Sequence, residues 1–370
     1  MSKLTKLTLR GYKSIKDATI EFGAMNVLIG ANGAGKSNLI SFFRMISEMM
    51  AGRFQVYVGV NGRGHAFVHH GTGTLYGFDS SLMVESEDWA TKYFAKWANT
   101  SGDTLLFDYE AVSYQNKDAP NERSEYPLPS GRFESGLALP FLDPILKTID
   151  PLIGFLNKLG VYHFHDTTVT SRMKQIGYVA SHTPLLHDGG NIAAFLYNLS
   201  FADLPSYRRI VSTVQLIAPF FRDFYLEPQM PSCSEVTLNW RHIDSDQVFG
   251  PHQLSDGTLR AICLIALLLQ PVEKLPSLIV VDEPELGLHP YALNVIAALF
   301  QKAASHTQVL ISTQSSAFLD QFQPEDVIVV NRTRDGTTFT RPDTQKLEAW
   351  LEEYSLGEVW DKNIIAGGPH

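Results

Sequence analysis

The chain has 370 residues, of which 44% are hydrophobic and 19% are charged, which is the composition of a globular protein and not of a disordered or fibrous one. Its formal net charge is -9, so it does not coat nucleic acid or an anionic membrane through its overall field. Only Cys233 and Cys263 are present, with no histidine or cysteine at metal spacing beside them, and we expect neither a disulfide framework nor a zinc site.

The chain shows no targeting or membrane signal. Residues 1–13 mix basic and apolar residues and contain no continuous apolar run of the kind found in a signal peptide. The longest apolar run, Ala261 to Leu269, is too short to cross a bilayer. We therefore expect a cytoplasmic protein without a membrane partner.

The first elements form a strand, loop and helix unit. Alternating apolar and polar residues between Leu4 and Ile20 predict two strands, and a third strand, Met25 to Ile29, ends in a glycine-rich turn. Asn38 to Met50 has apolar residues at helical spacing. The turn therefore joins a strand to a helix.

The segment up to Tyr114 is predicted to form an antiparallel β subdomain. Its predicted strands are Gln55 to Val60, His65 to His69, Leu75 to Phe78 and Thr104 to Ser113. Glu87 to Asn99 is predicted as a helix. Asn116 to Gly136 is polar, rich in proline and without a period, which predicts a loop or linker.

A mostly helical insertion and a second α/β segment follow. In the insertion the predicted helices are Phe141 to Leu159, Asn191 to Leu199 and Pro205 to Phe220, with strands at Val161 to Phe164, Phe224 to Glu227 and Val236 to Arg241. Then come helices at Asp256 to Leu269 and Tyr291 to Ser305, and strands at Leu278 to Val281, Gln308 to Ser312 and Asp326 to Asn331. This alternation is typical of a parallel sheet, and we predict an α/β fold with a mixed sheet. Its three parts would be an N-terminal lobe at 1–115, the insertion at 116–222 and a C-terminal lobe at 223–370.

The strongest motif is the glycine-rich turn itself. Residues 30–37, Gly-Ala-Asn-Gly-Ala-Gly-Lys-Ser, fit the phosphate loop G-x-x-x-x-G-K-S in the strand-to-helix context that it needs. Backbone N–H groups and the helix dipole would face a β-phosphate, the lysine would reach the β and γ oxygens, and the serine hydroxyl would bind Mg²⁺. We therefore expect ATP and Mg²⁺ as ligands. The candidate nucleotide-binding residues are Asn32, Gly33, Gly35, Lys36, Ser37 and Asn38.

A second motif is an apolar strand that ends in two acids. Leu278 to Val281 is followed by Asp282 and Glu283, which places both carboxylates at the carboxyl edge of a parallel sheet, where ligands bind. We expect Asp282 to act on Mg²⁺ through a bound water or through another ligand of the ion, and Glu283 to orient and polarise the attacking water.

Together these motifs resemble those of ABC-type ATPases. Leu254-Ser-Asp-Gly-Thr258 before an apolar helix looks like their signature segment, and residues 282–290, Asp-Glu-Pro-Glu-Leu-Gly-Leu-His-Pro, are similar to the Walker B and D-loop run of the RecF and SMC-like branch. Leu9 to Ile15 and Ser355 to Trp360 look like the flanks of compact bacterial RecF-like ATPases, whereas residues 50–250 match loosely. The resemblance implies a P-loop NTPase fold of the ABC-ATPase head type. The resemblance is to the OLD-like kind, whose relatives carry a C-terminal Toprim nuclease, and we expect none after Glu283 in this sequence.

The resemblance also implies that two chains share each nucleotide. Ser255 would cap the following helix and, with the N–H groups near Gly257, would offer donors to a γ-phosphate held by another subunit. ATP would then join two heads into a homodimer. A simple N-cap before a core helix is the competing interpretation of Ser255.

Gln314 stands at a strand end where the family commonly has a histidine that contacts the γ-phosphate. An amide can donate to a phosphate oxygen or hold the water, but it cannot carry a proton, which favours slow turnover. The family's Mg²⁺-sensing glutamine has no clear counterpart, and Gln55 and Gln115 are weak candidates.

Other polar residues are expected to be structural. His69-His70 and His163-x-His165-Asp166 are the groups that could suggest a metal. Two histidines at i and i+2 on a strand point the same way, and no further ligand lies nearby in the sequence, which argues against a metal. Asn191 is expected to cap the next helix. Four arginines would form either a basic face for DNA or a solvated side of the protein, and we favour the solvated side. They are Arg208, Arg209, Arg222 and Arg241.

Three functions fit these observations. The first is an ATPase head that dimerises on ATP, hydrolyses it with Glu283 as base, and clamps or releases DNA or a partner protein in DNA repair or anti-phage defence. The second is a slow, nucleotide-gated scaffold, as a dimer or a larger oligomer, that controls a separately encoded nuclease or toxin. The third, the energising subunit of a membrane transporter, fits least, because the segment between Ser37 and Ser255 is about twice as long as the resemblance allows for such a subunit.

Overall fold

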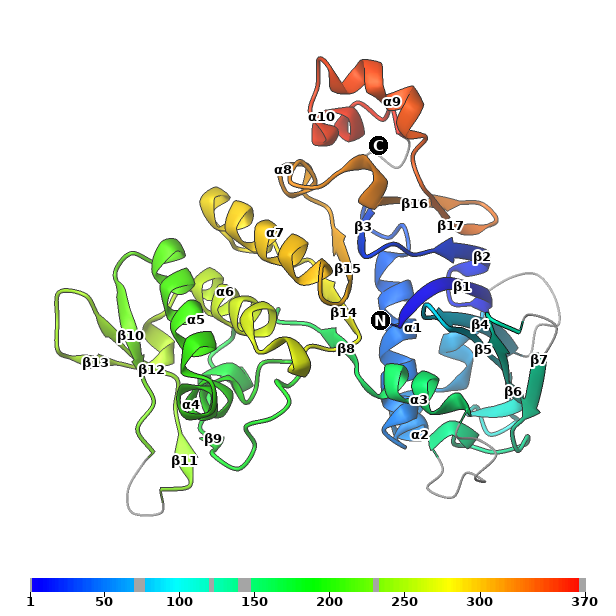
Figure 1. The fold of residues 1–370 in the computed structure, drawn as a ribbon, viewed down its shortest axis with the longest axis horizontal. Helices are drawn as coiled ribbons and strands as arrows, with labels where there is room; N and C mark the ends of the chain where they lie inside the picture. The colour runs from blue at the N-terminus through cyan, green and yellow to red at the C-terminus, as the bar shows by residue number, and fades with distance from the viewer. Residues whose placement is uncertain (1, 70–76, 120–122, 139–147, 229–232, 366–370) are drawn as a thin grey trace.

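Two six-stranded sheets form the framework of the protein (Figure 1). The computed structural model describes residues 2–69, 77–119, 123–138, 148–228 and 233–365. The central sheet has the order β17-β16-β3-β15-β14-β8, with β17 as its antiparallel edge strand and the other neighbours parallel. Its strands are β3 (Met25–Ile29), β8 (Leu159–Tyr162), β14 (Leu278–Asp282), β15 (Gln308–Thr313), β16 (Val327–Thr333) and β17 (Gly336–Thr340).

The second sheet is antiparallel throughout and has the order β2-β1-β4-β5-β6-β7. Its strands are β1 (Lys3–Tyr12), β2 (Ile15–Glu21), β4 (Gly77–Glu85), β5 (Trp89–Asn99), β6 (Leu105–Asn116) and β7 (Arg123–Pro127). The smaller strands are β9 (Gly177–Tyr178), β10 (Phe221–Tyr225), β11 (Glu235–Val236), β12 (Asn239–His242) and β13 (Val248–Phe249).

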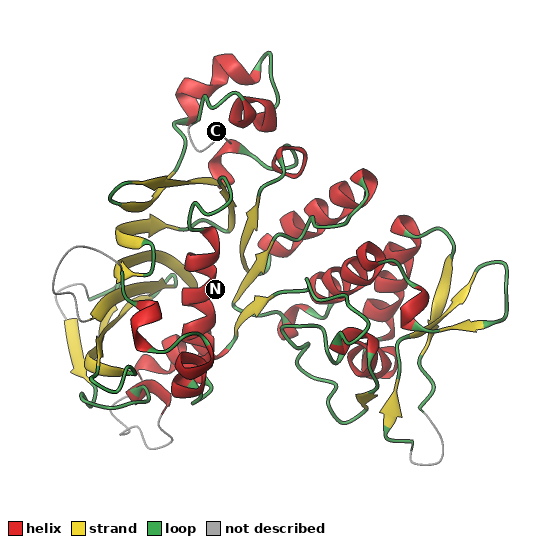
Figure 2. Cartoon of the chain, turned by 180° about the vertical axis from the view of Figure 1, so that it is seen from behind, coloured by secondary structure: helices red, strands yellow, loops and turns green. Residues whose placement is uncertain are grey.

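Helices cover both faces of the central sheet (Figure 2). They are α1 (Lys36–Met50), α2 (Phe54–Val60), α3 (Asp150–Asn157), α4 (Ile192–Ala202), α5 (Leu204–Ile217), α6 (Asp256–Leu269), α7 (Pro290–Ala304), α8 (Ser316–Leu319), α9 (Thr344–Leu351) and α10 (Leu356–Asp361). The helix α1 lies between the two sheets, whereas α4, α5 and α6 form a lobe on the other side of the central strands (Figure 1).

The central strands are apolar along their whole length because they contribute to two cores. Ile279 and Val281 pack into the core with α6 and α7, while Leu278 and Val280 pack into the core with α1 and the antiparallel sheet. Alternate residues of a strand point to opposite faces, so a strand buried on both faces needs a continuous apolar run. This run brings the acids that follow it to the carboxyl edge of the sheet.

The predicted α/β class with a mixed sheet and an antiparallel subdomain is confirmed, but three elements of the subdomain were predicted wrongly. Gln55 to Val60 is helical in α2, because Phe54 and Val58 are buried one turn apart. Glu87 to Asn99 contains the strand β5, in which Tyr93 and Trp97 are buried and every residue pairs with β6. His65 to His69 contains a 3₁₀ turn, Gly64–Phe67, in place of a strand.

The segment predicted as insertion and linker contributes strands to both sheets. The stretch at 116–136 contains β7, which pairs with β6. The strand β8 pairs in parallel with β14, so residues between 116 and 222 form one edge of the central sheet. The predicted strand Leu75 to Phe78 and the predicted helix Phe141 to Leu159 lie partly outside the described residues. The three-part division stays a prediction.

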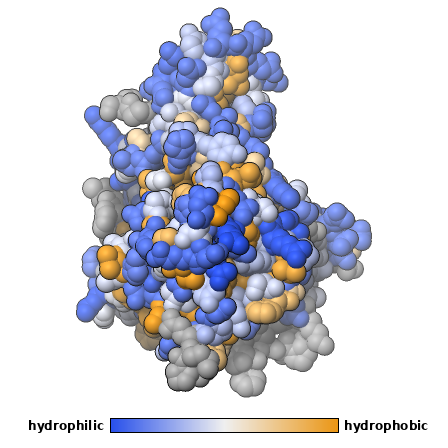
Figure 3. All heavy atoms as spheres, turned by 90° about the vertical axis from the view of Figure 1, so that its left-hand side faces the viewer, coloured by the Kyte–Doolittle hydropathy of each residue, from blue (hydrophilic) through white to orange (hydrophobic). Residues whose placement is uncertain are grey.

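The surface of the lobe around α5 is mixed. Figure 3 looks onto this side and shows apolar groups as scattered spots among hydrophilic ones. In the described part of the chain, none of the helices has both the length and the apolar character needed to cross a membrane.

Candidate nucleotide site

The loop between β3 and α1 has the backbone that phosphate binding needs. Gly33 and Gly35 have φ angles of 76° and 118°, which side chains rarely adopt. A Cβ atom on Gly35 would also collide with Thr337, whose hydroxyl donates to the carbonyl of Ala34 at 2.8 Å. The helix α1 begins without a side-chain cap and without an acid in its first turn. The positive end of its dipole is therefore left for an anionic ligand.

Lys36 lies folded back onto its own loop. Its Nζ atom donates to the carbonyls of Gly30 at 2.5 Å and Ala31 at 3.2 Å, and the side chain is 5% exposed. Burial lowers the pKa of Lys36, and the charges of Glu283 and Asp282 oppose this shift. The lysine of the phosphate loop therefore lies near the acids at the end of β14, and it lines one cavity with Glu283.

A cavity of about 160 Å³ lies where these groups meet. It is lined by residues 32–38, Glu283 and Gln314, so most of the predicted site residues come together. The strand order explains this, since β15, which ends before Gln314, lies between β3 and β14. Ser255 and Gly257 are not among the residues that line the cavity.

Asp282 and Glu283 are held by the neighbouring strand. Ser312 Oγ donates to Asp282 Oδ1, and His165 Nε2 donates to the carbonyl oxygen of Asp282 at 2.9 Å. Glu283 has a φ angle of 43°, and its N–H donates to the carbonyl of Ser312 at 3.0 Å. A left-handed backbone at a residue other than glycine is costly and typical of functional sites.

Gln314 contacts Glu283 directly, because its Nε2 atom donates to Glu283 Oε1. Its backbone N–H donates to Glu285 Oε1 at 3.1 Å, and Thr313 Oγ1 donates to the same oxygen at 2.5 Å. Glu285 therefore fixes the end of β15 that presents Gln314. The sequence analysis gave Glu285 no role, although the third acid of the Asp-Glu-Pro-Glu run was a signal for it.

Replacing Glu285 by glutamine is expected to stabilise the protein near pH 8, with a gain that shrinks as the pH falls towards about 4. Burial raises the pKa of this carboxyl, so the fold disfavours its charged form. The charged Glu285 therefore makes the wild-type protein less stable. This effect is complete above the raised pKa and absent below the ordinary pKa of a glutamic acid. Glutamine keeps an oxygen for Thr313 and for the backbone of Gln314. Thermal unfolding at several pH values measures the effect, and a gain independent of pH would contradict the explanation.

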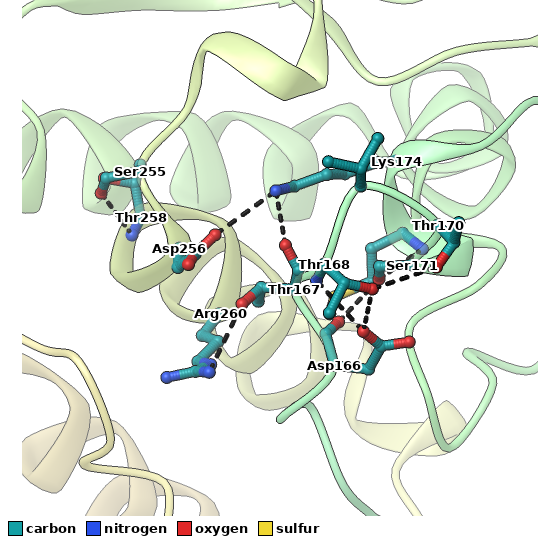
Figure 4. Close-up of polar contacts among 12 residues, drawn as sticks. Asp166, Thr167, Thr168, Thr170, Ser171, Lys174, Ser255, Asp256, Thr258 and Arg260 are labelled. Carbon is teal, nitrogen blue, oxygen red and sulfur yellow. Dashed lines mark hydrogen bonds and ion pairs between the residues drawn. The ribbon is translucent and has the colours of Figure 1, made fainter.

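The predicted signature segment begins the helix α6, which belongs to the lobe of α4, α5 and α6 (Figure 1). Figure 4 shows the start of this helix and its polar contacts. Ser255 is the N-cap of α6, with Oγ accepting from the N–H of Thr258 at 3.1 Å, and its side chain is exposed. A Cβ atom on Gly257 would collide with the carbonyl of Gly287, so the helix start packs closely on the turn after Glu283. The predicted cap is confirmed.

Two basic residues fix this helix start to its surroundings. Arg260 donates to the carbonyls of Leu286 and His165, each at 2.9 Å. Lys174, which is buried, lies 3.3 Å from Asp256 and donates to the carbonyl of Thr167 at 2.6 Å (Figure 4). Since His165 also bonds Asp282, one segment connects the signature helix with the acidic end of β14.

Several other polar residues lie away from the cavity. Gln55 donates to the carbonyls of Leu105 at 2.8 Å and Phe133 at 2.6 Å, and neither Gln55 nor Gln115 lines the cavity. Asn191 precedes α4, but its side chain does not cap the helix, so that prediction was wrong. Its amide instead holds the preceding loop through Leu186, Ser181 and Pro184.

The histidines and arginines named in the sequence analysis form contacts outside the cavity. His69 Nδ1 lies 2.6 Å from the carbonyl of Lys13, and His70 is outside the described residues. No group of three histidines, cysteines or acids suited to a metal occurs in the part of the chain that the structure describes. Arg209, Arg222 and Arg241 contact Ser206, Asp246 and the ring of Tyr225, respectively.

A glycine loop between a strand and a helix, with an acidic pair on a nearby parallel strand, defines a P-loop NTPase. Residues 2–100 match the family described as "AAA ATPase domain", and residues 144–320 match "AAA domain, putative AbiEii toxin, Type IV TA system". These matches place AAA-type ATPase sequence in both halves of the chain, and the fold is that of a P-loop NTPase.

Individual proteins are similar to the chain in part or in fold. A stretch of 77 residues, 20% of this chain, is 36% identical to the Old nuclease of Escherichia phage P2, of which it covers 13%. The Smc head bound to the C-winged helix domain of ScpA matches 94% of this chain and 99% of that one, with a TM-score of 0.57 and 15% identity. The Smc head with an extended coiled coil, bound to the C-terminal domain of ScpA from Pyrococcus furiosus, covers 95% and 99%, with a TM-score of 0.57 and 14% identity. At these identities the structures show the fold alone.

Proposed function

We propose that this ATPase is an ABC-type head that dimerises on ATP and switches conformation on DNA or a partner protein, in anti-phage defence or DNA repair. One observation carries the proposal. The cavity contains the phosphate loop, Glu283 and Gln314 but neither Ser255 nor Gly257, which lie on another lobe. An exposed capped helix start with free N–H groups is suited to an anion presented by a second chain.

The residues fit a magnesium nucleotide. Lys36 would leave the carbonyls of Gly30 and Ala31 for phosphate oxygens, and α1 would direct its first N–H groups at them. Ser37 and Asp282 would hold Mg²⁺, which neutralises phosphate charge when bound. Glu283 would take the proton of the attacking water, and Gln314 would keep its carboxylate in place.

A second candidate function is a slow-turnover, nucleotide-gated scaffold that assembles with a separately encoded effector. The observation that favours it is the Gln314–Glu283 contact, because an amide occupies the position of a group that titrates in related heads. A nuclease and a family named for a toxin among the matches support an effector of that kind.

Replacing Gln314 by leucine is expected to lower the rate of ATP hydrolysis about 10- to 100-fold without a comparable change in ATP affinity. Leucine cannot donate to Glu283, so the carboxylate loses its orientation. Phosphate release and nucleotide binding are measured together, with the exposed Gln345→Leu as control. An unchanged rate would show that Gln314 does not position the base.

The wild-type protein is expected to double its mass with Mg-ATP and to stay monomeric with ADP. Light scattering measures the mass, and nucleotide binding is followed in the same samples. Lys36→Ala should neither bind ATP nor dimerise, whereas Lys302→Ala, at an exposed position on α7, should behave as wild type. A wild-type chain that binds ATP and remains monomeric would refute the shared site.

A further inference from the structure

A second, larger cavity of about 760 Å³ lies outside the nucleotide site. Its walls are the second half of α1, the strand β8, the loop at 182–187, α4 and the segment at 270–276. None of the proposed nucleotide-binding residues lines it. Its volume is in the range of pockets that bind small molecules, which is roughly 300–1,000 Å³.

The polar side of this cavity carries an unpaired positive charge. Among the described residues, the guanidinium of Arg44 forms no ion pair or side-chain hydrogen bond, although it is partly buried. The acid one turn further along the helix, Glu48, is already paired with Arg53 at 2.8 Å. The other charged lining residues are exposed at the rim and are Lys158, Glu273 and Lys274.

A histidine shares this side of the cavity. Burial lowers the pKa of His187, and the nearby charge of Arg44 lowers it further. The chain at His187 is held in place, because its carbonyl accepts from the N–H of His163 at 2.8 Å. A neutral imidazole beside a cation can donate to a ligand oxygen without adding repulsion.

Another part of the cavity lining is apolar. It is formed by side chains from α1, β8, the 182–187 loop, α4 and the segment before β14, which are Met50, Val161, Leu185, Phe195 and Leu275. A cavity with one apolar wall and a few convergent polar groups is typical of sites for small organic ligands.

We propose that this cavity is a second ligand site, which binds a small organic anion with a carboxylate, sulfonate or phosphate group on an apolar body. The anionic group would pair with Arg44, and the body would lie against the apolar wall. An anion there satisfies a guanidinium that the described chain leaves unpaired, and charge-assisted pairs of this kind are strong in a partly dehydrated site.

The walls of the cavity lead to the nucleotide site, so occupancy is expected to affect nucleotide binding. The helix α1 begins at Lys36 and carries Arg44 (Figure 1). The strand β8 lines the cavity and continues to His165, which bonds Asp282. Pro276 lines it just before β14, which ends at Asp282.

Two probes of the same shape test the site. Anilinonaphthalene sulfonate is an aromatic anion, and N-phenyl-1-naphthylamine is the same ring system without the sulfonate. We expect one molecule of the anion to bind per chain, and Arg44→Met to weaken it about tenfold or more while changing the neutral probe less than about twofold. Arg208→Met, on the exposed side of α5, is the matched control and should change neither.

A second variant shows where the probes bind. Asn198→Trp fills the cavity from α4 and should weaken both probes. The proposal is overturned if the wild type does not bind the anion, if Arg44→Met weakens both probes equally, or if Asn198→Trp leaves both unaffected.

The effect of the second site on ATP binding is measured separately. This effect rests on the proposed function. Saturating sulfonate probe should change the Kd of Mg-ATP at least about threefold in the wild type and not in Arg44→Met. An equal Kd with and without probe would overturn the coupling. Lys36→Ala should lose ATP and keep the probe, so a failure of the proposed nucleotide site is distinguishable from a failure of the second site.

Discussion

Replacing Glu283 by glutamine is expected to lower the rate of ATP hydrolysis about a thousandfold while ATP stays bound. The side chain lines the cavity beside the phosphate loop, and its backbone is held at a φ angle of 43° by β15. Glutamine has nearly the same shape, so it should keep the contact with Gln314 and remove only the proton acceptor. Phosphate release and nucleotide binding measure the two effects separately.

The same substitution should trap the dimer. If hydrolysis separates two heads that ATP has joined, the Glu283→Gln variant accumulates as a dimer with Mg-ATP, whereas the wild type returns to monomers as ATP is consumed. Glu352→Gln changes an exposed acid that lines neither cavity and should behave as wild type. Phosphate release at the wild-type rate in Glu283→Gln would show that another group activates the water.

The nucleotide loop could be predicted from sequence because its interactions are local. Lys36 bonds carbonyls five and six residues earlier in the chain, and the glycine angles are decided within the loop. The acids at 282 and 283 were also predictable, since a strand buried on both faces leaves a continuous apolar run before them.

Contacts between distant segments could not be predicted in this way. Gln314 meets Glu283 because β15 and β14 are neighbours, and strand order is a property of the whole sheet. The segment at 89–99 looked helical because its charged residues hide an alternation that only pairing with β4 and β6 makes clear. Arg44 could not be identified from the sequence, because its lack of a partner depends on how α1 packs beside β8.

The role of Ser255 can be separated from helix stability by a matched serine. Ser255 and Ser355 are both N-caps whose hydroxyls accept a backbone N–H, at 3.1 Å and 3.3 Å. Replacing either by alanine should cost about 1 kcal/mol of stability. Only Ser255→Ala should weaken ATP-driven dimerisation, by about tenfold or more, because only that hydroxyl would meet a nucleotide on another chain.

Mixing two inactive chains gives the strongest expected effect. A Lys36→Ala chain cannot hold ATP but carries Ser255, and a Ser255→Ala chain holds ATP but cannot close over its partner's nucleotide. Their mixed dimer contains one complete site, formed by the loop of the second chain and the helix start of the first. Neither variant pairs well with itself, so ATP joins mainly mixed dimers, and each of these has one of two sites. Hydrolysis should therefore return towards, and not above, about half of the wild-type rate in an equal mixture. If Ser255 acted only within its own chain, the mixture would be as inactive as the two variants are alone.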